Sequence, residues 1–333
     1  MKTMVIEKFG APDLFGLTEI DPPNLKPGHV VVKVMASSVN PIDCKIRSGA
    51  VPAIAPPFPA VLHGDLAGII TKVADDVDQF SVGDEIYGCS GGVSSVSGAL
   101  CESMLVDADT IARKPSSLTM AEAEALPLVA ITAWDGQFNK ARTPAGRDVL
   151  IHGGLGGVGH IAVQLAVNAG ANVYTTVGDD MEFAEAQAFG AKAAINYKTE
   201  SPSDYAARLT DNQGFDLIFD TVGGPNLENS FAAAKGNGEI ITTTASVTLD
   251  LSPMLQKSLS LHVVFMLLPL ISGHGLAMYH HALSDAASLV DQGKIKPRID
   301  PTQFTFSEVG AAHAFLESGR AKGKVVLIND LHA

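Results

Sequence analysis

A glycine-rich turn between two regular segments carries the clearest chemistry in this sequence. Between Asp148 and Ala169, a short apolar run leads into Gly154, Gly156 and Gly159, which have the spacing G-x-G-x-x-G, and a helical pattern follows. Glycine at these positions lets a strand turn sharply, lets the backbone approach a pyrophosphate, and lets the helix pack close to the strand. The free N–H groups at the start of such a helix favour anions. The sequence therefore predicts a site for a dinucleotide.

The elements expected on either side of this turn fall into two groups. The first third contains short β-type runs, such as 30–35, 67–73 and 85–87, separated by Pro and Gly, which predicts a compact and mainly antiparallel β unit. A helix over 120–139, broken near Pro127, follows. Beyond it, strands alternate with helices, which predicts a parallel sheet covered on both faces.

The expected strands of this sheet are 149–152, 172–177, 194–197, 215–220 and 239–243, and its expected helices are 158–168, 181–189, 204–209 and 226–234. Two further helices, 276–292 and 308–317, and a strand over 323–329 are expected near the end of the chain.

The composition excludes several classes of partner. The chain has 333 residues, of which 46% are hydrophobic, and a net charge of −13. An acidic chain without basic clusters argues against binding to nucleic acid or to an anionic membrane. The longest nearly continuous apolar run, 263–271, is too short to span a bilayer, and 1–10 lacks the apolar core of a signal peptide. With only three scattered cysteines, we expect a cytoplasmic globular enzyme.

Eight motifs together resemble the zinc-independent quinone oxidoreductase branch of the medium-chain dehydrogenase/reductase (alcohol dehydrogenase-like) superfamily. They are VNPIDCKIRSG (39–49), HGDLAG (63–68), VGDEIYG (82–88), LPLVAITAW (126–134), HGGLGGVG (152–159), INY (195–197), FDTVGG (219–224) and GKVVL (323–327). The resemblance covers nearly the whole chain. It implies an α/β protein in which a GroES-like, mainly-β catalytic domain, residues 1–124 and 268–333, encloses an inserted Rossmann domain with a doubly wound parallel sheet, residues 125–267.

The same resemblance implies an active site in the cleft between the two domains and a homodimer formed through edge strands of the Rossmann sheets. The apolar run 263–268 is the candidate for that edge, because an exposed edge favours pairing with another chain.

The segments that carry zinc ligands in zinc-dependent relatives lack those ligands here. Asn40 stands at the position of the first cysteine, Gly64 at that of the histidine, and the third position falls in 127–129, which is Pro-Leu-Val. Because zinc needs three protein ligands and an open position, we expect no metal. Without a Lewis acid, the acceptor must delocalise the added charge itself, as a quinone or an α,β-unsaturated carbonyl does.

By this resemblance, three residues are expected at the reacting groups. Asn40 and Thr132 are expected beside the nicotinamide, and His63 is a candidate proton donor to the product. Each also has a structural interpretation: a turn-forming Asn before Pro41, a Thr bonded to a helix carbonyl, and a buried histidine. The expected cofactor-binding residues are Gly154, Gly156, Gly157, Val158, Gly159, Thr176, Asp179, Tyr197, Thr221 and Lys324.

Other members of these motifs are expected to be structural. Asp43 and Arg47 are expected to form an ion pair, Cys44 to be a buried thiol, and Tyr87 to pack inside the β unit. His152 is expected to position the glycine turn. For Lys324 the alternative to a cofactor contact is a solvated surface lysine.

The end of the second Rossmann strand distinguishes NADPH from NADH. NAD-specific sites place an acidic residue there, whereas this chain has Val177. Tyr197 flanks the 2′-phosphate in the quinone oxidoreductase branch, which also favours NADPH. However, the branch often has a lysine where Glu182 stands, and Asp179 would suit the ribose hydroxyls of NADH. We expect NADPH, with NADH as the alternative.

The predicted activity is hydride transfer from NAD(P)H to a quinone without a metal. The alternatives are an NAD(P)H-dependent reductase of α,β-unsaturated carbonyls and, from another class, a non-catalytic sensor or crystallin-like protein that binds the cofactor. The last would be expected to lose Asn40 and Thr132, which are present. The apolar segments 51–59 and 266–271 favour a small hydrophobic electrophile as the acceptor.

Overall fold

The computed structural model describes residues 1–143 and 145–332. The chain forms two compact units. Unit 1 comprises Met1–Leu128, Leu267–Gly293 and Pro297–Ala333, and unit 2 comprises Val129–Met266 and Lys294–Lys296. No helix among the described residues combines the length and apolar character that a membrane crossing requires.

Unit 1 is built on an antiparallel sheet whose strands run in the order β14-β15-β3-β4-β5-β7, with β6 also paired to β3; only β14 and β15 are parallel. A separate hairpin joins β1 and β2. The strands are β1 (Lys2–Val5), β2 (Gly16–Glu19), β3 (His29–Val39), β4 (Asp65–Val73), β5 (Glu85–Cys89), β6 (Ser103–Asp107), β7 (Ile111–Arg113), β14 (Phe304–Thr305) and β15 (Val325–Ile328). The mainly antiparallel β unit predicted from the sequence is confirmed.

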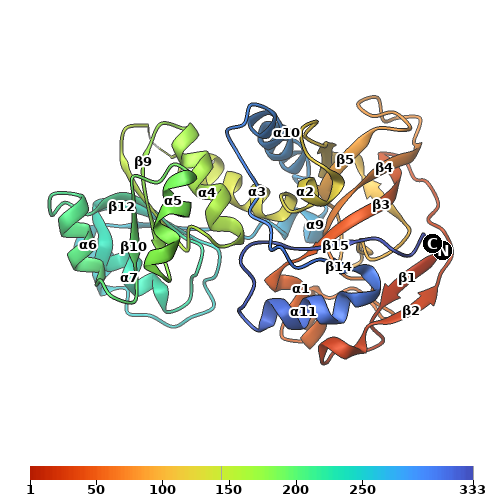
Figure 1. Cartoon of the computed structure of the whole chain (residues 1–333), viewed down its shortest axis with the longest axis horizontal. Coiled ribbons are helices and arrows are strands. Elements are labelled where there is room, and N and C mark those ends of the chain that lie inside the picture. The colour runs from red at the N-terminus through yellow and green to blue at the C-terminus, as the bar shows by residue number, and fades with distance from the viewer. Residues whose placement is uncertain (144, 333) are drawn as a thin grey trace. The chain divides into compact units, whose positions relative to one another are not determined.

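Among the helices of unit 1, α2, α10 and α11 pack on this sheet, and α1 packs beside α11, as Figure 1 shows. The helices are α1 (Pro41–Ser48), α2 (Met120–Glu124), α9 (Leu268–Ser272), α10 (Ala277–Asp291) and α11 (Val309–Glu317), with short 3-10 turns at Pro12–Leu14, Pro52–Ile54, Ala108–Thr110 and Phe306–Glu308. A further helix, α3 (Pro127–Trp134), begins at the end of unit 1 and continues into unit 2. The break predicted near Pro127 is present.

Unit 2 contains a six-stranded parallel sheet in the order β10-β9-β8-β11-β12-β13. The strands are β8 (Asp148–His152), β9 (Asn172–Val177), β10 (Ala193–Asn196), β11 (Phe215–Asp220), β12 (Ala234–Thr242) and β13 (Ser260–Val263). The helices are α4 (Gly157–Asn168), α5 (Phe183–Ala188), α6 (Pro202–Leu209), α7 (Asn226–Ala233) and α8 (Ser252–Lys257), with a π-helical turn at Asp135–Lys140 and a 3-10 turn at Asp180–Glu182.

The strand order of unit 2 reverses between β8 and β11. Numbered within the unit, the order is 3-2-1-4-5-6, which is the doubly wound arrangement, and ligands bind such sheets at the carboxyl ends of the strands where the order reverses. Right-handed crossovers then place α4 and α5 on one face and α6 to α8 on the other. The predicted alternation of strands and helices is confirmed.

The edge of this sheet differs from the prediction. The sheet ends at β10 on one side and at β13 on the other, and the chain leaves β13 after Val263. Only the first residue of 263–268 therefore belongs to an edge strand, and the expectation that this run forms the edge is wrong. Val264 and Met266 are buried, and Leu268 begins α9 with Pro269 in its first turn. The run is therefore apolar because part of it is buried outside the sheet, whereas the true edge strand, Ser-Leu-His-Val, has a mixed composition.

The core of unit 2 gives a direct test of this packing. Phe231 on α7 is fully buried in a cluster with Leu150, Ile218 and Ile240. We expect Phe231→Ala to lower the free energy of unfolding by about 3–5 kcal/mol, because it leaves a cavity. Urea unfolding followed by circular dichroism measures this loss. Leu255→Ala, at a side chain that is 84% exposed, is the control, and equal effects of the two variants would contradict the assignment.

Candidate functional site

The glycine turn joins β8 to α4, as the sequence predicts. A Cβ on Gly154 would overlap the Oγ1 of Thr175, and a Cβ on Gly159 would overlap the carbonyl oxygen of Gly153. Gly156 is the N-cap of α4, which begins at the next residue. The first N–H groups of α4 lack helical partners, so the turn presents donors and partial positive charge at the end of β8.

Two threonines brace this turn. The Oγ1 of Thr176 accepts a hydrogen bond from the Gly153 N–H at 2.9 Å, and the Oγ1 of Thr221 donates to the His152 carbonyl at 2.6 Å. The backbone carbonyl of Thr176 also accepts from the Gly154 N–H. The structure thus places Thr176 and Thr221 at the turn, where they hold its shape, and their contact with a cofactor stays a prediction.

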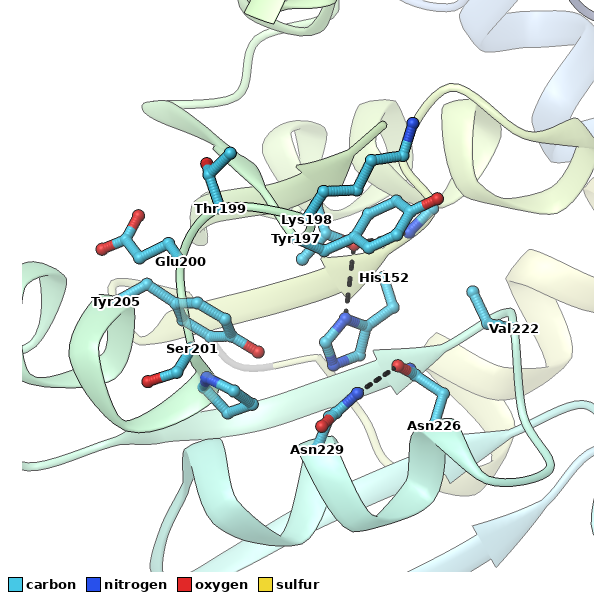
Figure 2. Close-up of a pocket in the computed structure, with 13 residues that line it drawn as sticks. His152, Tyr197, Lys198, Thr199, Glu200, Ser201, Tyr205, Val222, Asn226 and Asn229 are labelled. Carbon is cyan, nitrogen blue, oxygen red and sulfur yellow. Dashed lines mark hydrogen bonds between the residues drawn. The ribbon is translucent and has the colours of Figure 1, made fainter. Parts of the chain in front are cut away.

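A pocket of about 580 Å³ opens beside the turn, entirely within unit 2 (Figure 2). Its walls come from the end of β8, from Thr176 at the end of β9, from the segment 197–202 after β10, and from the residues that follow β11. Several of these side chains were not predicted as site residues: Lys198, Ser201, Tyr205, Asn226 and Asn229. Their common signal in the sequence is position, because they follow the carboxyl ends of β10 and β11.

The carboxylates of the acidic segment after β9 accept hydrogen bonds from nearby residues. Asp179 accepts from the Met181 N–H at 2.9 Å, Glu182 accepts from the Gly178 N–H at 3.1 Å, and Asp180 accepts from the Asn196 side chain at 2.7 Å. These carboxylates therefore shape the turn that leads into α5.

Tyr197 and Lys198 line the pocket close to that turn. The Nζ of Lys198 lies 3.7 Å from the position that a Cβ on Gly178 would take, and the Tyr197 hydroxyl lies 3.6 Å from it. A cationic side chain therefore stands at the end of β9, where the NAD-type carboxylate is missing.

Unit 1 contains a buried polar cluster centred on Asp65. The Oδ2 of Asp65 accepts hydrogen bonds from Asn40 Nδ2 at 2.8 Å, from Ser38 Oγ at 3.0 Å, and from Lys324 Nζ at 3.2 Å. Its Oδ1 accepts from the Leu128 N–H at 2.8 Å. Lys324 Nζ also donates to Asn40 Oδ1 at 2.5 Å. Asn40, Asp65 and Lys324 thus form a closed triangle inside unit 1.

The alternative interpretation of Lys324 as a solvated surface lysine is wrong, because its side chain is only 4% exposed.

Asn40 is held by a second contact. Its backbone N–H donates to Asp43 Oδ2 at 2.7 Å, and the two residues form a capping box at the start of α1. Burial raises the pKa of Asp43 to about 7.

The predicted ion pair between Asp43 and Arg47 is wrong. Arg47 donates to the Gly10 carbonyl and pairs with Glu317 on α11 at 2.5 Å. The two residues are four positions apart on α1, but Asp43 turns back to cap the helix, so its carboxylate faces the helix start.

Glu124 extends the charged region of unit 1. It is fully buried, and neither carboxyl oxygen has a hydrogen-bond partner among the described residues. Burial and the neighbouring Asp65 raise its pKa well above the usual range. Sequence reasoning missed Glu124 because it lies in an alanine-rich helix.

His63 lies in a buried row of side chains. Its Nδ1 is 3.1 Å from Ser37 Oγ, its Nε2 is 2.9 Å from His313 Nε2, and the Nδ1 of His313 is 3.4 Å from Cys44 Sγ. Burial lowers the pKa of His63 well below its usual range and that of His313 to about 3. Burial raises the pKa of Cys44 to about 12, so the expectation of a buried thiol is confirmed.

The remaining predicted residues lie inside the elements. Thr132 is buried on α3, and Tyr87 is packed inside unit 1 with its hydroxyl donating to the Leu283 carbonyl at 2.6 Å, as expected. Over residues 1–143 and 145–332, no group of three or more His, Cys, Asp and Glu side chains is arranged to hold a metal ion.

The buried histidine pair predicts acid sensitivity. Because His63 and His313 have lowered pKa values in the folded protein, the unfolded chain binds more protons below pH 6.5, and stability falls as the pH falls from that value. His313, whose pKa is lowered to about 3, then costs about 2 kcal/mol at pH 5, and His63 acts in the same direction. Urea midpoints at pH 7.5 and pH 5 should differ less in His313→Phe than in the wild type. The exposed His281→Gln is the control, and an unchanged pH dependence in His313→Phe would contradict this account.

Comparison with known proteins places these features in a family. Residues 26–116 match the alcohol dehydrogenase GroES-like domain, and residues 189–327 match the zinc-binding dehydrogenase family. A 2-methylene-furan-3-one reductase of Solanum lycopersicum is 32% identical, and the match covers 98% of this chain and 79% of the relative.

Two solved structures share the fold. An alcohol dehydrogenase superfamily protein from Novosphingobium aromaticivorans matches with a TM-score of 0.94 and 39% identity, covering 98% of this chain and 99% of that one. The Escherichia coli quinone oxidoreductase complexed with NADPH matches with a TM-score of 0.85 and 26% identity, covering 98% and 100%. The chain belongs to the medium-chain dehydrogenase/reductase superfamily, in its quinone oxidoreductase-type branch.

Proposed function

We propose that this protein is an NAD(P)H-dependent oxidoreductase that reduces a quinone, with an α,β-unsaturated carbonyl as the second candidate acceptor. The observation that carries the proposal is the glycine turn with its pocket at the reversal of strand order in unit 2. The solved quinone oxidoreductase that binds NADPH supports the quinone, and the relative named as a furanone reductase supports the enone.

The residues of unit 2 fit a dinucleotide. The close approaches at Gly154 and Gly159 form a cradle that a Cβ would fill, and α4 begins directly behind it. Gly157, Val158 and Gly159 would hold the pyrophosphate through backbone N–H groups, whereas Gly156, whose N–H donates to the Gly153 carbonyl at 2.8 Å, would line the cradle without a side chain. A reduced nicotinamide supplies the hydride when the cofactor is bound. We assign unit 2 as the cofactor domain and unit 1 as the catalytic domain; the boundaries expected from the sequence, 124/125 and 267/268, lie close to the unit boundaries 128/129 and 266/267.

The donor set of unit 1 favours chemistry without a metal. The polar cluster presents an amide from Asn40 and an amine nitrogen from Lys324, and Lys324 already pairs with Asp65. An amide and a cationic lysine are poor partners for zinc, which prefers thiolate, imidazole and carboxylate ligands. We propose that Asn40 and Lys324 orient and polarise the acceptor, so that negative charge developing on its oxygen is stabilised. Thr132 is proposed as a contact of the nicotinamide.

His63 is better suited to a structural role than to proton donation. Both ring nitrogens are engaged, and the ring is fully buried and neutral. We therefore propose that His63 and His313 join the segment before β4 to α11, and that the proton of the product comes from elsewhere.

We propose a preference for NADPH. Tyr197 and Lys198 line the pocket beside Gly178, where the 2′-phosphate of NADPH would gain a cationic partner. Glu182 and Asp179 are bonded to backbone N–H groups, which partly satisfies their charge. We also propose a homodimer through the edge strand β13.

The first test of the activity is steady-state oxidation of NADPH with 1,2-naphthoquinone and with a simple enone. We expect turnover with the quinone, and a loss of at least about tenfold in kcat/KM for Gly159→Ala, because the new Cβ displaces the turn. Gly16→Ala, where a Cβ meets open space, is the control. Binding of the cofactor without turnover of either acceptor would instead support the non-catalytic alternative.

The cofactor preference rests on a single charge. We expect Lys198→Glu to lower the ratio of kcat/KM for NADPH to that for NADH by about tenfold or more, since a carboxylate replaces the partner of the phosphate. Lys192→Glu makes the same change at an exposed lysine outside the pocket and should leave the ratio unaltered. A ratio that is equal in Lys198→Glu and the wild type would refute this role of Lys198.

A further inference from the structure

His152 places a buried polar atom at the wall of the unit 2 pocket. His152 ends β8 and is only 3% exposed, and its Nε2 has no hydrogen-bond partner within the described part of the chain. Figure 2 shows the ring among the lining side chains, with one nitrogen bonded and the other without a partner. A buried polar group in this condition destabilises the protein unless a ligand or water binds it.

The neighbouring bonds are compatible with a proton on Nε2 of His152. Thr176 Oγ1 accepts from the Gly153 N–H at 2.9 Å and lies 3.3 Å from Nδ1 of His152. We assign the Thr176 O–H as the donor to Nδ1, which leaves the proton of the imidazole on Nε2. Burial lowers the pKa of His152 despite the nearby Asp220, so the ring is neutral. His152 therefore presents one N–H donor to the pocket.

A second chain of bonds leaves an acceptor at the same pocket. Asp220 Oδ1 accepts from Asn226 Nδ2 at 3.0 Å, and Asn226 Oδ1 accepts from Asn229 Nδ2 at 2.9 Å. Because a carboxylate only accepts, it determines the orientation of both amides. The Oδ1 of Asn229 is left as an acceptor, and Asn229 lines the pocket with His152.

We propose that His152 and Asn229 together bind the adenine base of the cofactor, with Nε2–H of His152 donating to a ring nitrogen and Oδ1 of Asn229 accepting from the 6-amino group. This inference rests on the proposed function. On each of two edges, adenine presents a ring-nitrogen acceptor beside the amino donor. The partly exposed Tyr197 and Val222 offer apolar surface to the flat base in the same pocket.

The pairing distinguishes adenine from hypoxanthine. Hypoxanthine carries a carbonyl oxygen at C6, so Asn229 Oδ1 would face another acceptor. We therefore expect the protein to bind NADPH about tenfold more tightly than its hypoxanthine analogue. A preference for the 2′-phosphate is separate, because it concerns Lys198.

Isothermal titration of the full chain with NADPH and with the hypoxanthine analogue tests the proposal. We expect His152→Phe and Asn229→Leu each to weaken NADPH binding and to reduce the tenfold preference to within about twofold. Asn229 is exposed on α7, so its variant tests the proposal even where His152→Phe folds poorly. Gln187→Ala, at an exposed position on α5 outside the pocket, is the control and should keep the preference.

The opposing results are distinct. An equal loss of affinity for both dinucleotides in His152→Phe and Asn229→Leu would show that these residues only support the turn, and a wild type without preference would overturn the proposal while leaving the proposed function intact. Failure of the wild type to bind either dinucleotide would overturn the proposed function itself and this inference with it.

Discussion

The buried ion pair between Lys324 and Asp65 is the interaction on which the organisation of unit 1 depends. A charge removed from water must be paired, and removal of one partner leaves the other uncompensated. Here the pair also orients Asn40 and accepts the backbone of Leu128 at the start of α3. The same contacts that satisfy two buried charges therefore place an amide and a lysine together and hold the chain where it leaves unit 1.

In unit 2, close backbone contacts take the place that the buried ion pair has in unit 1. The glycine turn is shaped by close approaches that exclude a Cβ and by hydroxyls of Thr176 and Thr221, so no charged side chain is needed to form it. Charged side chains of both signs, Lys198 and Glu200, line the pocket beside the turn. A turn built without charged side chains thus lies beside a pocket wall that carries them.

The features that the sequence predicted correctly are those that depend on residues close together in the chain. The strands and helices of both units, the break at Pro127 and the glycine turn follow from periodicity, proline and the need for close backbone approach. The triangle of unit 1 was not predicted, because Asn40 and Lys324 lie 284 positions apart and only the fold brings them together. The Asp43–Arg47 pair failed because helix spacing permitted it while capping was the stronger competitor. Lys198 and Tyr205 belong to no recognised motif, so only the folded structure shows that they line the pocket.

The pairing of β15 with β3 has a consequence for the synthesis of the chain. Val39 in β3 pairs with Val325 in β15. The sheet of unit 1 therefore stays incomplete until β15, the last described strand, has been synthesised. About 200 residues separate the end of the first segment of unit 1 from β15, which at roughly 5–20 residues per second is about 10–40 s of translation. During that interval the edge of β3 is open to other chains, whereas the strands of unit 2 are contiguous and are free to assemble first. The end of β3 therefore lacks its β15 partner in a nascent chain until the last described strand emerges.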